Sequence, residues 1–414
     1  MSPDFYHRTT CRLCGGVSLT KVLALKATPP ANAFVGKEQL DTPQQTFPLD
    51  VFFCEDCHHV QLLDVVDPRI LFENYVYVSG TSPVFVKHFE DYAAFVVKRF
   101  TPKPGSLVFD IGSNDGTLLR AFKNAGYSVL GVDPAKDIAA KASAEGIETI
   151  TGFFSPAMAQ EIRTDRGPAS VITANNVFAH IDDLAGVLKG VRALLDDEGV
   201  FVFEVSYLVD VFEHTLFDTI YHEHLAYHSV GPLVAFMQDH DMELIDAVRV
   251  PSHGGSLRAV AKRKAGHRPI EKSVAELVAL EKAMGLDKAE TFVDFGIRID
   301  VLGAELSSLL RDLKAQGRTI AAFGAPAKAT TLMYHFDIGP DLIDFIVDDS
   351  PLKQGLYCPG MHIAVLPSSA LYDNRPDDIV ILAWNFAQPI MERHKQFTAA
   401  GGRFIVPLPH LQVH

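Results

Sequence analysis

Apolar runs alternate with helix-length segments over the middle of the chain. Seven runs are rich in β-branched and aromatic residues, as strands are; they are LVFDIG, SVLGVDP, IETITGFF, ASVITANN, GVFVFEVSY, MELIDAVRV and SLRAVAKRK. The first five are separated by segments long enough for helices, as parallel strands require, whereas only PSHGG separates the last two, as in a hairpin. The pattern predicts an α/β domain whose sheet ends in an antiparallel pair.

The regions on either side of this domain have patterns of their own. Before it, FENYVYVSGTSPVFVKHFEDYAAFVVKRF predicts a short loop that leads into an amphipathic helix and ends at TPKPG. After it, residues 269–317 are helical and charged, and a second α/β unit follows in TIAAFGAPAKATTLMYHF, IDFIVDDSPLKQGLYCPG, DDIVILAWNF and FIVPLP. We expect a small module over residues 1–70, an α/β domain over residues 71–266, and a helical bridge with a C-terminal Rossmann-like domain over residues 267–414.

The composition agrees with this organisation and narrows the function. A chain of 414 residues, 48% hydrophobic and 21% charged, predicts two or three domains. We expect a cytoplasmic enzyme, because the sequence shows neither a signal peptide nor an apolar run long enough to cross a membrane. The formal charge of −14 argues against nucleic acid or a membrane as a partner, although a local basic pocket could still bind a phosphorylated ligand. The oligomeric state stays open, and a monomer is compatible with the sequence.

Four cysteines of the N-terminal module form two CxxC pairs; they are Cys11 and Cys14 in CRLC, and Cys54 and Cys57 in CEDC. In a cytoplasmic chain this spacing favours a zinc ion over disulfides, because each pair can turn two thiolates toward one tetrahedral metal. Unpaired buried thiols or a redox pair are the alternatives. His58 or His59 could replace one thiolate, but four sulfurs already close the site, which indicates a structural metal. Cys358 stands alone and is interpreted as a small packed residue.

The loop after the first predicted strand, in LVFDIGSNDGTLL, indicates a cofactor. It lacks the GxGxxG sequence of dinucleotide sites, since it has only Gly112 and Gly116, and Asp115 lies beside the start of the helix. A carboxylate at this position repels phosphate. It suits S-adenosylmethionine, which carries an ammonium group and a sulfonium.

A second acid supports this cofactor. Asp133 lies 23 residues after Asp110, at the end of the next strand, where an acid would bind the ribose hydroxyls. A βαβ unit with incidental surface acids is the alternative. The predicted cofactor-binding residues all lie at or just beyond the ends of predicted strands; they are Asp110, Gly112, Asn114, Asp115, Asp133, Pro134 and Asn175.

The densest cluster of reactive side chains lies in FDTIYHEHLAYHS, residues 217–229, just after the fifth predicted strand. It contains Tyr221, His222, Glu223, His224, Tyr227 and His228. Because the carboxyl ends of strands in doubly wound sheets open onto the ligand crevice, these residues are catalytic candidates. The HEH sequence does not match the HExxH of zinc proteases, so we expect no catalytic metal here. The alternative is a polar core in which these side chains satisfy one another.

Two glycine-bearing segments are candidates for binding an anionic substrate. In AFGAPAKATT, Gly324 and Lys328 flank the start of a helix, and Thr330 and Thr331 add hydroxyl groups, so backbone amides and one lysine form a candidate phosphate site. An ordinary glycine turn with a solvated lysine is the alternative. In HGGSLR, two glycines and Arg258 would let backbone and guanidinium approach an anion, and a plain hairpin turn is the alternative.

These motifs, taken in their order, carry a family resemblance over the whole chain. The order is CRLC and CEDC, DIGSNDG, NNVFAHI, YHEH, HGGSLR, AFGAPAKATT and VDDSPLKQGLYCPG. The chain resembles the S-adenosylmethionine-dependent sugar C-methyltransferases that act on nucleotide-linked 4-keto-6-deoxy sugars, related to the tetronitrose-pathway carbon-3 methyltransferase. The resemblance implies a small N-terminal zinc-binding module, a class I (Rossmann-like) methyltransferase domain and a C-terminal Rossmann-like domain that binds the nucleotide sugar.

The resemblance also implies an active site. The expected catalytic residues are His224 as the base, with Tyr221, Glu223, His180 and a tyrosine from the segment after the zinc module, for which Tyr75 is chosen and Tyr77 stays open. The acid of GVDP is an aspartate where a glutamate is expected in many relatives, and this change keeps the ribose-binding carboxylate. The expected substrate-binding residues are His222, Arg258, Lys328 and Thr330.

The implied reaction gives these residue types a common purpose. Methylation beside a ketone requires removal of a proton and stabilisation of the enolate, and histidine, with an unperturbed pKa of about 6.5, suits the first task. Glu223 could orient the imidazole, and Tyr221 or His222 could donate a hydrogen bond to the enolate oxygen. For His180 a packing role is the alternative. Two other functions stay open: methylation of oxygen, nitrogen or a non-sugar enolisable acceptor, and a non-enzymatic zinc-containing adaptor.

Overall fold

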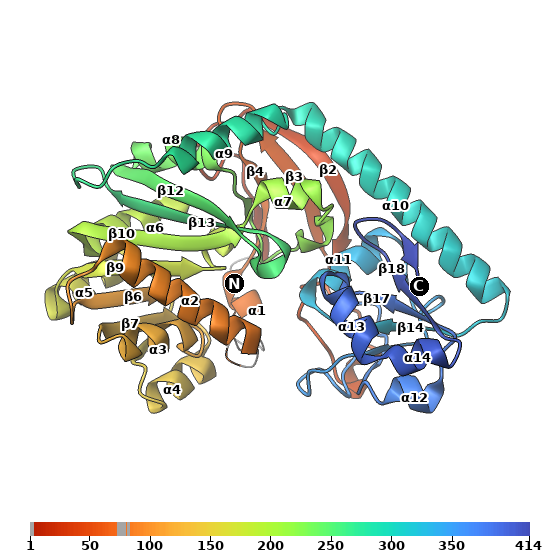
Figure 1. Ribbon diagram of the computed structural model, residues 1–414. Helices are drawn as coiled ribbons and strands as arrows, with labels where there is room; N and C mark the ends of the chain where they lie inside the picture. Colours follow the sequence, from red (N-terminus) through yellow and green to blue (C-terminus); the bar gives the residue numbers. More distant parts are fainter. Residues whose placement is uncertain (1–3, 73–79, 81–82) are drawn as a thin grey trace.

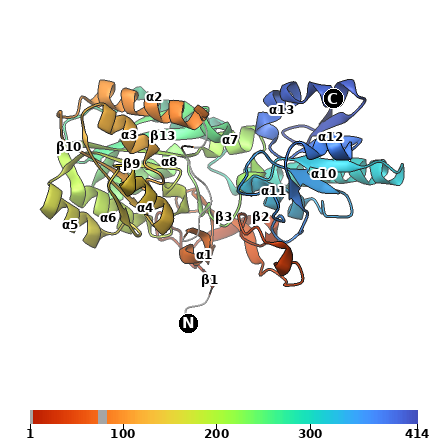
Figure 2. The same cartoon turned by 90° about the horizontal axis from the view of Figure 1, so that it is seen from below.

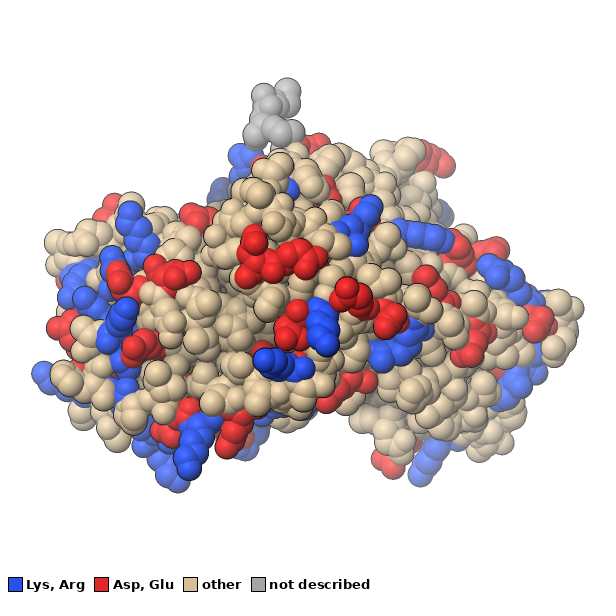
Figure 3. All heavy atoms as spheres, turned by 90° about the horizontal axis from the view of Figure 1, so that it is seen from above, with Lys and Arg blue, Asp and Glu red and all other residues tan. Residues whose placement is uncertain are grey.

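The computed structural model describes residues 4–72, 80 and 83–414 and has two α/β lobes with a small antiparallel sheet between them (Figure 1). Tyr75 and Tyr77, the candidates for the active-site tyrosine, lie outside these residues. Of the helices in the described part, none combines the length and the apolar character that a bilayer crossing needs. On the face seen from above, acidic and basic side chains are interspersed (Figure 3).

The seven predicted strands form one sheet in the order β12-β13-β10-β9-β6-β7-β8. They are β6 (Leu107–Ile111), β7 (Ser128–Asp133), β8 (Thr149–Thr151), β9 (Ala169–Asn175), β10 (Leu195–Ser206), β12 (Met242–Val250) and β13 (Ser256–Arg263). Strands from β8 to β10 run parallel, whereas β13 runs antiparallel to β10 and β12, which confirms the predicted sheet. The strand order reverses between β6 and β9, and doubly wound sheets bind ligands at such a point.

Helices cover both faces of this sheet (Figures 1 and 2). The predicted amphipathic helix is α2 (Pro83–Phe100), which packs on α3 (Thr117–Asn124) and buries Phe89, Tyr92 and Val96 against one face. The other helices of this lobe are α4 (Lys136–Ala144), α5 (Pro156–Arg166), α6 (Leu184–Leu194), α7 (Leu208–Glu213) and α8 (Val230–Asp239). The sheet is therefore buried on both sides, and its carboxyl edge is left to the loops.

The N-terminal module consists of short antiparallel strands and ends at α1 (Pro68–Phe72). β1 (Phe5–His7) pairs with β5 (Asp64–Val66), and a second sheet contains β2 (Leu19–Thr28), β3 (Phe47–Cys54) and β4 (Val60–Leu62). The fourth strand of this second sheet is β11 (Ala226–Tyr227), which comes from the segment after YHEH. The module thus shares a sheet with a segment of the first α/β lobe. The sequence does not reveal this link, because a strand of two residues has no periodic pattern.

The C-terminal domain is a second α/β unit, with the strand order β16-β15-β14-β17-β18-β19. Its strands are β14 (Ile320–Phe323), β15 (Phe345–Val347), β16 (Val365–Leu366), β17 (Asp378–Ile381), β18 (Arg403–Val406) and β19 (Gln412–Val413), and its helices are α11 (Ala327–His335), α12 (Ala370–Asn374), α13 (Ala387–Arg393) and α14 (Lys395–Ala399). The charged segment before it forms α9 (Lys272–Ala283) and α10 (Ala289–Ala315). Helix α10 contacts β2 and spans from one lobe to the other (Figure 1).

The segment that carries His224 lies where the three parts of the chain meet. On one side β11 pairs with β4 of the N-terminal module. On the other side Thr331 on α11 donates a hydrogen bond of 2.7 Å to the carbonyl oxygen of Ile220, and Trp384 donates one of 2.6 Å to Asp218. Every part of the chain therefore contributes to the position of this segment.

Candidate active site and zinc centre

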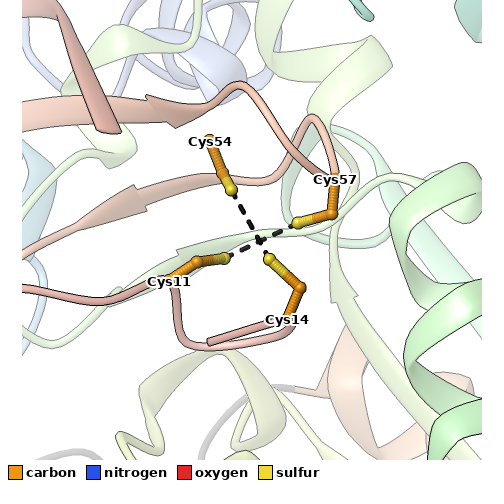
Figure 4. A group of neighbouring side chains, drawn as sticks. All are labelled: Cys11, Cys14, Cys54 and Cys57. Carbon is orange, nitrogen blue, oxygen red and sulfur yellow. Dashed lines mark hydrogen bonds between the residues drawn. The ribbon is translucent and has the colours of Figure 1, made fainter. Parts of the chain in front are cut away.

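The four cysteine sulfurs of the N-terminal module point toward one another (Figure 4). Cys11 Sγ lies 3.6 Å from Cys57 Sγ, Cys14 Sγ lies 3.6 Å from Cys54 Sγ, and all four sulfurs lie within 4.8 Å of one another. A tetrahedral zinc ion with Zn–S bonds of about 2.3 Å requires sulfurs about 3.8 Å apart, so these four residues fit the metal. The prediction of a structural zinc site is confirmed, and its four thiolates leave no position for a substrate.

The two histidines after the second CxxC pair lie outside this cluster. His58 stacks on Phe53, with 5.8 Å between ring centroids. His59 is fully buried, and its ring centroid lies 5.5 Å from that of His228. Since neither imidazole belongs to the group of converging ligand atoms, the zinc ligands are the four cysteines.

The loop after β6 is shaped by a glycine and a buried acid. Gly112 has a φ of 70°, and a Cβ atom there would lie 2.3 Å from Val177 Cγ2, so only glycine fits. Asp110 accepts a hydrogen bond of 2.6 Å from the hydroxyl of Thr173. Burial raises the pKa of Asp110 to about 7. A cation bound nearby would favour the ionised form of this carboxyl group.

Two further acids draw together the loops at the carboxyl edge of the sheet. Asp133 ends β7 and accepts hydrogen bonds of 2.9 Å from the backbone amides of Asn114 and Ala135. Asp115 accepts one of 2.8 Å from the backbone amide of Gly80. The acids that the sequence singled out therefore lie at the carboxyl ends of β6 and β7 and on the loop that follows β6.

Asn175 and Pro134 lie at the same edge. Asn175 ends β9, next to β6 in the sheet, and its buried side-chain amide makes no hydrogen bond of normal geometry within the described residues. Pro134 directly follows Asp133. The carboxyl edge of the sheet therefore offers Gly112 and the three acids Asp110, Asp115 and Asp133. This combination fits S-adenosylmethionine, which carries a ribose and positive charge.

His224 and His180 face each other, with 4.9 Å between their ring centroids. His180 ends a short 3-10 helix, η3 (Phe178–His180), that follows β9. The ring centroid of Tyr221 lies 4.1 Å from that of His224. His224 Nδ1 lies 2.7 Å from the carbonyl oxygen of Thr219. Because a carbonyl oxygen only accepts hydrogen bonds, Nδ1 carries the proton and Nε2 is the basic nitrogen of the neutral ring.

Glu223 and His222 face the N-terminal module. Glu223 is buried, and its Oε1 accepts a hydrogen bond of 2.7 Å from the side-chain amide of Asn32. His222 is also buried, and its Nε2 lies 3.2 and 3.1 Å from the carbonyl oxygens of Phe47 and Pro48. Burial lowers the pKa of His222. The imidazole of His222 is thus bonded to β3 through Nε2, and its Nδ1 has no hydrogen-bond partner within the described residues.

The candidate phosphate residues on α11 have partners in the protein. Lys328 Nζ lies 3.5 Å from Oδ2 of Asp218 and 4.0 Å from the ring centroid of Trp384, and 13% of its side chain is exposed. Burial lowers the pKa of Lys328. Thr330 is buried and donates a hydrogen bond of 3.3 Å to the carbonyl oxygen of Ala31. The hydroxyl of Thr330 therefore joins α11 to the N-terminal module.

Arg258 is held by a buried carboxylate. Its Nε donates a hydrogen bond of 2.6 Å to Oε1 of Glu204 on the neighbouring strand, and its guanidinium lies 4.4 Å from the ring centroid of Tyr92. The other oxygen of Glu204 lies 2.7 Å from Nε2 of His88 on α2. The ion pair of Arg258 with Glu204 joins β13 to β10, and the second oxygen of Glu204 extends the contact to α2.

Sequence reasoning missed five residues that organise this site: Arg12, Asn32, His88, Glu204 and Asp218. None belongs to a motif of its own, and each bonds to a residue distant in the sequence. Four of them lie inside segments already singled out: Arg12 in CRLC, His88 in the predicted amphipathic helix, Glu204 in GVFVFEVSY and Asp218 in the segment that contains YHEH. The place of these residues within those segments was the only indication of a role that the sequence offered.

A class I methyltransferase sheet with an acidic cofactor loop, joined to a four-cysteine zinc module and a second Rossmann-like domain, defines a zinc-containing methyltransferase. Three family models match consecutive parts of the chain: a zinc binding domain over residues 11–72, a methyltransferase domain over residues 85–247 and a C-methyltransferase C-terminal domain over residues 251–409. C-methyltransferase NovU from Streptomyces niveus is 36% identical over 403 residues, which cover 97% of this chain and 96% of that protein. The chain belongs to this C-methyltransferase family. It is an S-adenosylmethionine-dependent C-methyltransferase with zinc as its structural metal.

Solved structures resemble part of the chain. The PH0226 protein from Pyrococcus horikoshii is 16% identical, with a TM-score of 0.37, and the match covers 45% of this chain and 95% of that one. Magnesium protoporphyrin IX methyltransferase from Synechocystis, solved with bound S-adenosylmethionine, is 16% identical with a TM-score of 0.32, over 43% of this chain and 79% of that one. These matches concern the fold alone.

Proposed function

We propose that the protein transfers the methyl group of S-adenosylmethionine to the carbon beside the ketone of a nucleotide-diphosphate-linked keto-deoxy sugar, with His224 as the base. The observation that carries the proposal is the hydrogen bond of 2.7 Å between His224 Nδ1 and the carbonyl oxygen of Thr219. It assigns the proton to Nδ1, so that Nε2 can accept a proton from the acceptor carbon. A neutral imidazole with a fixed tautomer is the form that a general base needs near neutral pH.

The residues around His224 have distinct roles in this proposal. His180 and Tyr221 lie against its ring and restrict its rotation. The hydroxyl of Tyr221 donates a hydrogen bond to the enolate oxygen once the proton has left. Glu223, bonded to Asn32, holds the backbone next to His224 and is a positioning residue. Tyr75, outside the described residues, supplies a second phenol.

The proposed cofactor site spans the carboxyl ends of β6, β7 and β9. Asp133 and Pro134 meet the ribose, and Asp110 and Asp115 supply negative charge for the ammonium and sulfonium. Gly112 lets the cofactor approach the backbone closely. Asn114 and Asn175 contribute amide groups. When bound, S-adenosylmethionine supplies an electrophilic methyl group. The chain itself removes the proton, orients the acceptor and excludes water.

The proposed site of the nucleotide diphosphate is the loop 324–326 and the start of α11, where backbone amides suit phosphate. Lys328 in the first turn adds positive charge, with Asp218 as its counter-ion. His222, Arg258 and Thr330 complete the proposed substrate site, and His222 Nε2, Arg258 Nε and the hydroxyl of Thr330 also bond to the protein. The enzyme is proposed to work in the cytoplasm, since the four zinc ligands must stay reduced.

Replacement of His224 tests the base. In His224→Ala, calorimetry is expected to show unchanged binding of S-adenosylmethionine, while methyl transfer falls by about a hundredfold or more. A panel of keto sugar nucleotides incubated in deuterated water with demethylated cofactor isolates the first step. The native enzyme should then exchange the proton at the acceptor carbon, and His224→Ala should not.

The matched control is His267→Ala, because the side chain of His267 is 91% exposed and bonds to Glu198 on the surface. Its methyl transfer and proton exchange should match those of the native enzyme. Normal proton exchange in His224→Ala would remove His224 from the base role. Transfer of labelled methyl to an oxygen or nitrogen of the acceptor would reject carbon methylation of the sugar.

A further inference from the structure

Arg12 lies inside the zinc-binding turn, between Cys11 and Cys14, yet none of its side chain is exposed. A guanidinium has five N–H donors, and a buried one needs acceptors for them. The acceptors here are side-chain oxygens of Gln61 and Asp182 and the carbonyl oxygen of Leu225. A residue of the metal-binding turn is therefore bonded directly to the methyltransferase lobe.

One edge of the guanidinium holds the segment that follows His180. Nε and Nη2 of Arg12 lie 3.2 and 3.1 Å from Oδ1 of Asp182, two residues after His180. Arg8 donates a hydrogen bond of 2.8 Å to the same oxygen, and Tyr6 bonds to the other oxygen. Asp182 is thus fixed from the N-terminal strand as well as from the zinc-binding turn.

Another donor of the same guanidinium holds the segment that contains His224. Nη1 of Arg12 donates a hydrogen bond of 3.0 Å to the carbonyl oxygen of Leu225, the residue directly after His224. The backbone amide of Leu225 donates one of 2.9 Å to the carbonyl oxygen of Ala179, the residue directly before His180. These bonds close a ring of contacts that includes both histidine-bearing segments.

We propose that Arg12 is the positioning residue through which the zinc site fixes His180 and His224 relative to each other. The zinc ion fixes the turn of Cys11 and Cys14, and with it the backbone of Arg12. The planar donors of the guanidinium then set the distance between the two segments, as groups next to a metal ligand orient their neighbours. This inference rests on the proposed function, in which His224 removes the proton. It gives the zinc module a part in catalysis without any contact between metal and substrate.

Arg12→Met tests this inference, with Arg8→Met as the matched control. Arg8 also binds Asp182, but within the described residues the hydrogen bonds of its side chain go only to Asp182 and Thr10. Arg12→Met should bind S-adenosylmethionine normally, while hydrogen exchange rises in peptides covering residues 178–182 and 222–226 and kcat falls about tenfold to a hundredfold. Arg8→Met should stay within about twofold in kcat, because its ion pair is partly exposed.

Removal of zinc from the native enzyme gives a second readout that does not depend on activity. Chelation should raise hydrogen exchange in the same two segments, and added zinc should restore protection. Native exchange in both segments of Arg12→Met, or after chelation, would overturn the inference. Should Arg12→Met fail to fold, Arg12→Lys decides, because lysine keeps the charge but cannot satisfy both segments with one planar group. Native kcat and native protection in Arg12→Lys would also overturn it.

These outcomes are separate from those of the proposed function. If His224 is not the base, His224→Ala stays active, yet the rise in hydrogen exchange in Arg12→Met remains. If Arg12 has no positioning role, His224→Ala still loses methyl transfer, and the two segments of Arg12→Met keep their protection.

Discussion

The indole nitrogen of Trp384 lies 2.6 Å from Oδ2 of Asp218, and this bond joins the C-terminal domain to the segment that leads to His224. Lys328 approaches the same carboxylate at 3.5 Å and lies over the indole ring. Asp218 is fully buried, and burial raises its pKa. A carboxylate at such a depth is stable only while its partners remain.

Lys328→Met should therefore destabilise the protein, because it leaves the buried carboxylate of Asp218 without its cation. We expect the free energy of unfolding to fall by about 3–5 kcal/mol, measured by urea unfolding near neutral pH. Asp218→Asn combined with Lys328→Met removes both charges and should recover most of the loss. Equal losses in the single and the double variant would show that the two groups do not interact.

The fold was predictable from the sequence to the extent that it rests on local patterns. Strand and helix periods identified the mixed sheet, the helix α2 and the helical segment before the C-terminal domain, and the spacing of Cys11, Cys14, Cys54 and Cys57 identified the zinc ligands. Each helix, each strand and each CxxC pair is specified by residues that lie close together in the sequence.

The partners of single side chains could not be predicted in this way. Asn32 bonds to Glu223 across 191 positions, and Arg12 to Leu225 across 213, and no spacing rule reaches that far. For the same reason the sequence could not show that Thr330 bonds to Ala31 and Arg258 to Glu204.

The zinc site is expected to hold about one metal ion per chain and to stabilise the fold. Cys57→Ser should lower the zinc content and the melting temperature, because a hydroxyl does not replace a thiolate ligand. Cys358→Ala is the control, since Cys358 is buried far from the cluster in the sequence and is not a ligand. Metal analysis together with thermal unfolding checks this. Full zinc content in Cys57→Ser would contradict the assignment.

Asp133→Asn should weaken binding of S-adenosylmethionine by about tenfold to a hundredfold, because a hydrogen-bonding group loses its charge and one acceptor atom. In the native chain its two oxygens hold the backbone amides of Asn114 and Ala135. Asp137→Asn, at an exposed position on α4, should leave the affinity unchanged. Calorimetry measures both variants, and equal affinities would remove Asp133 from the cofactor site.

Asp110 makes stability depend on pH in the opposite sense to most acids. Burial raises its pKa to about 7, so the folded chain binds this proton more tightly than the unfolded chain. The contribution of Asp110 to the free energy of unfolding is fully present below about pH 4 and is lost as the pH rises to about 7. Asp110→Asn removes this titration. The test compares the free energies of unfolding of Asp110→Asn and of the native chain in the absence of cofactor. The value for the variant minus the value for the native chain should increase by a few kcal/mol between about pH 4 and about pH 8.

Cofactor binding should have the reverse dependence at the same residue. A bound sulfonium favours the ionised carboxylate, so the native chain releases a proton from Asp110 on binding and its affinity rises between about pH 6 and about pH 7. Asp110→Asn should bind more weakly, with a smaller dependence on pH over this interval. Calorimetry in two buffers with different ionisation enthalpies counts the released protons. An equal proton count in the native chain and in Asp110→Asn would mean that the charge of Asp110 does not meet the cofactor.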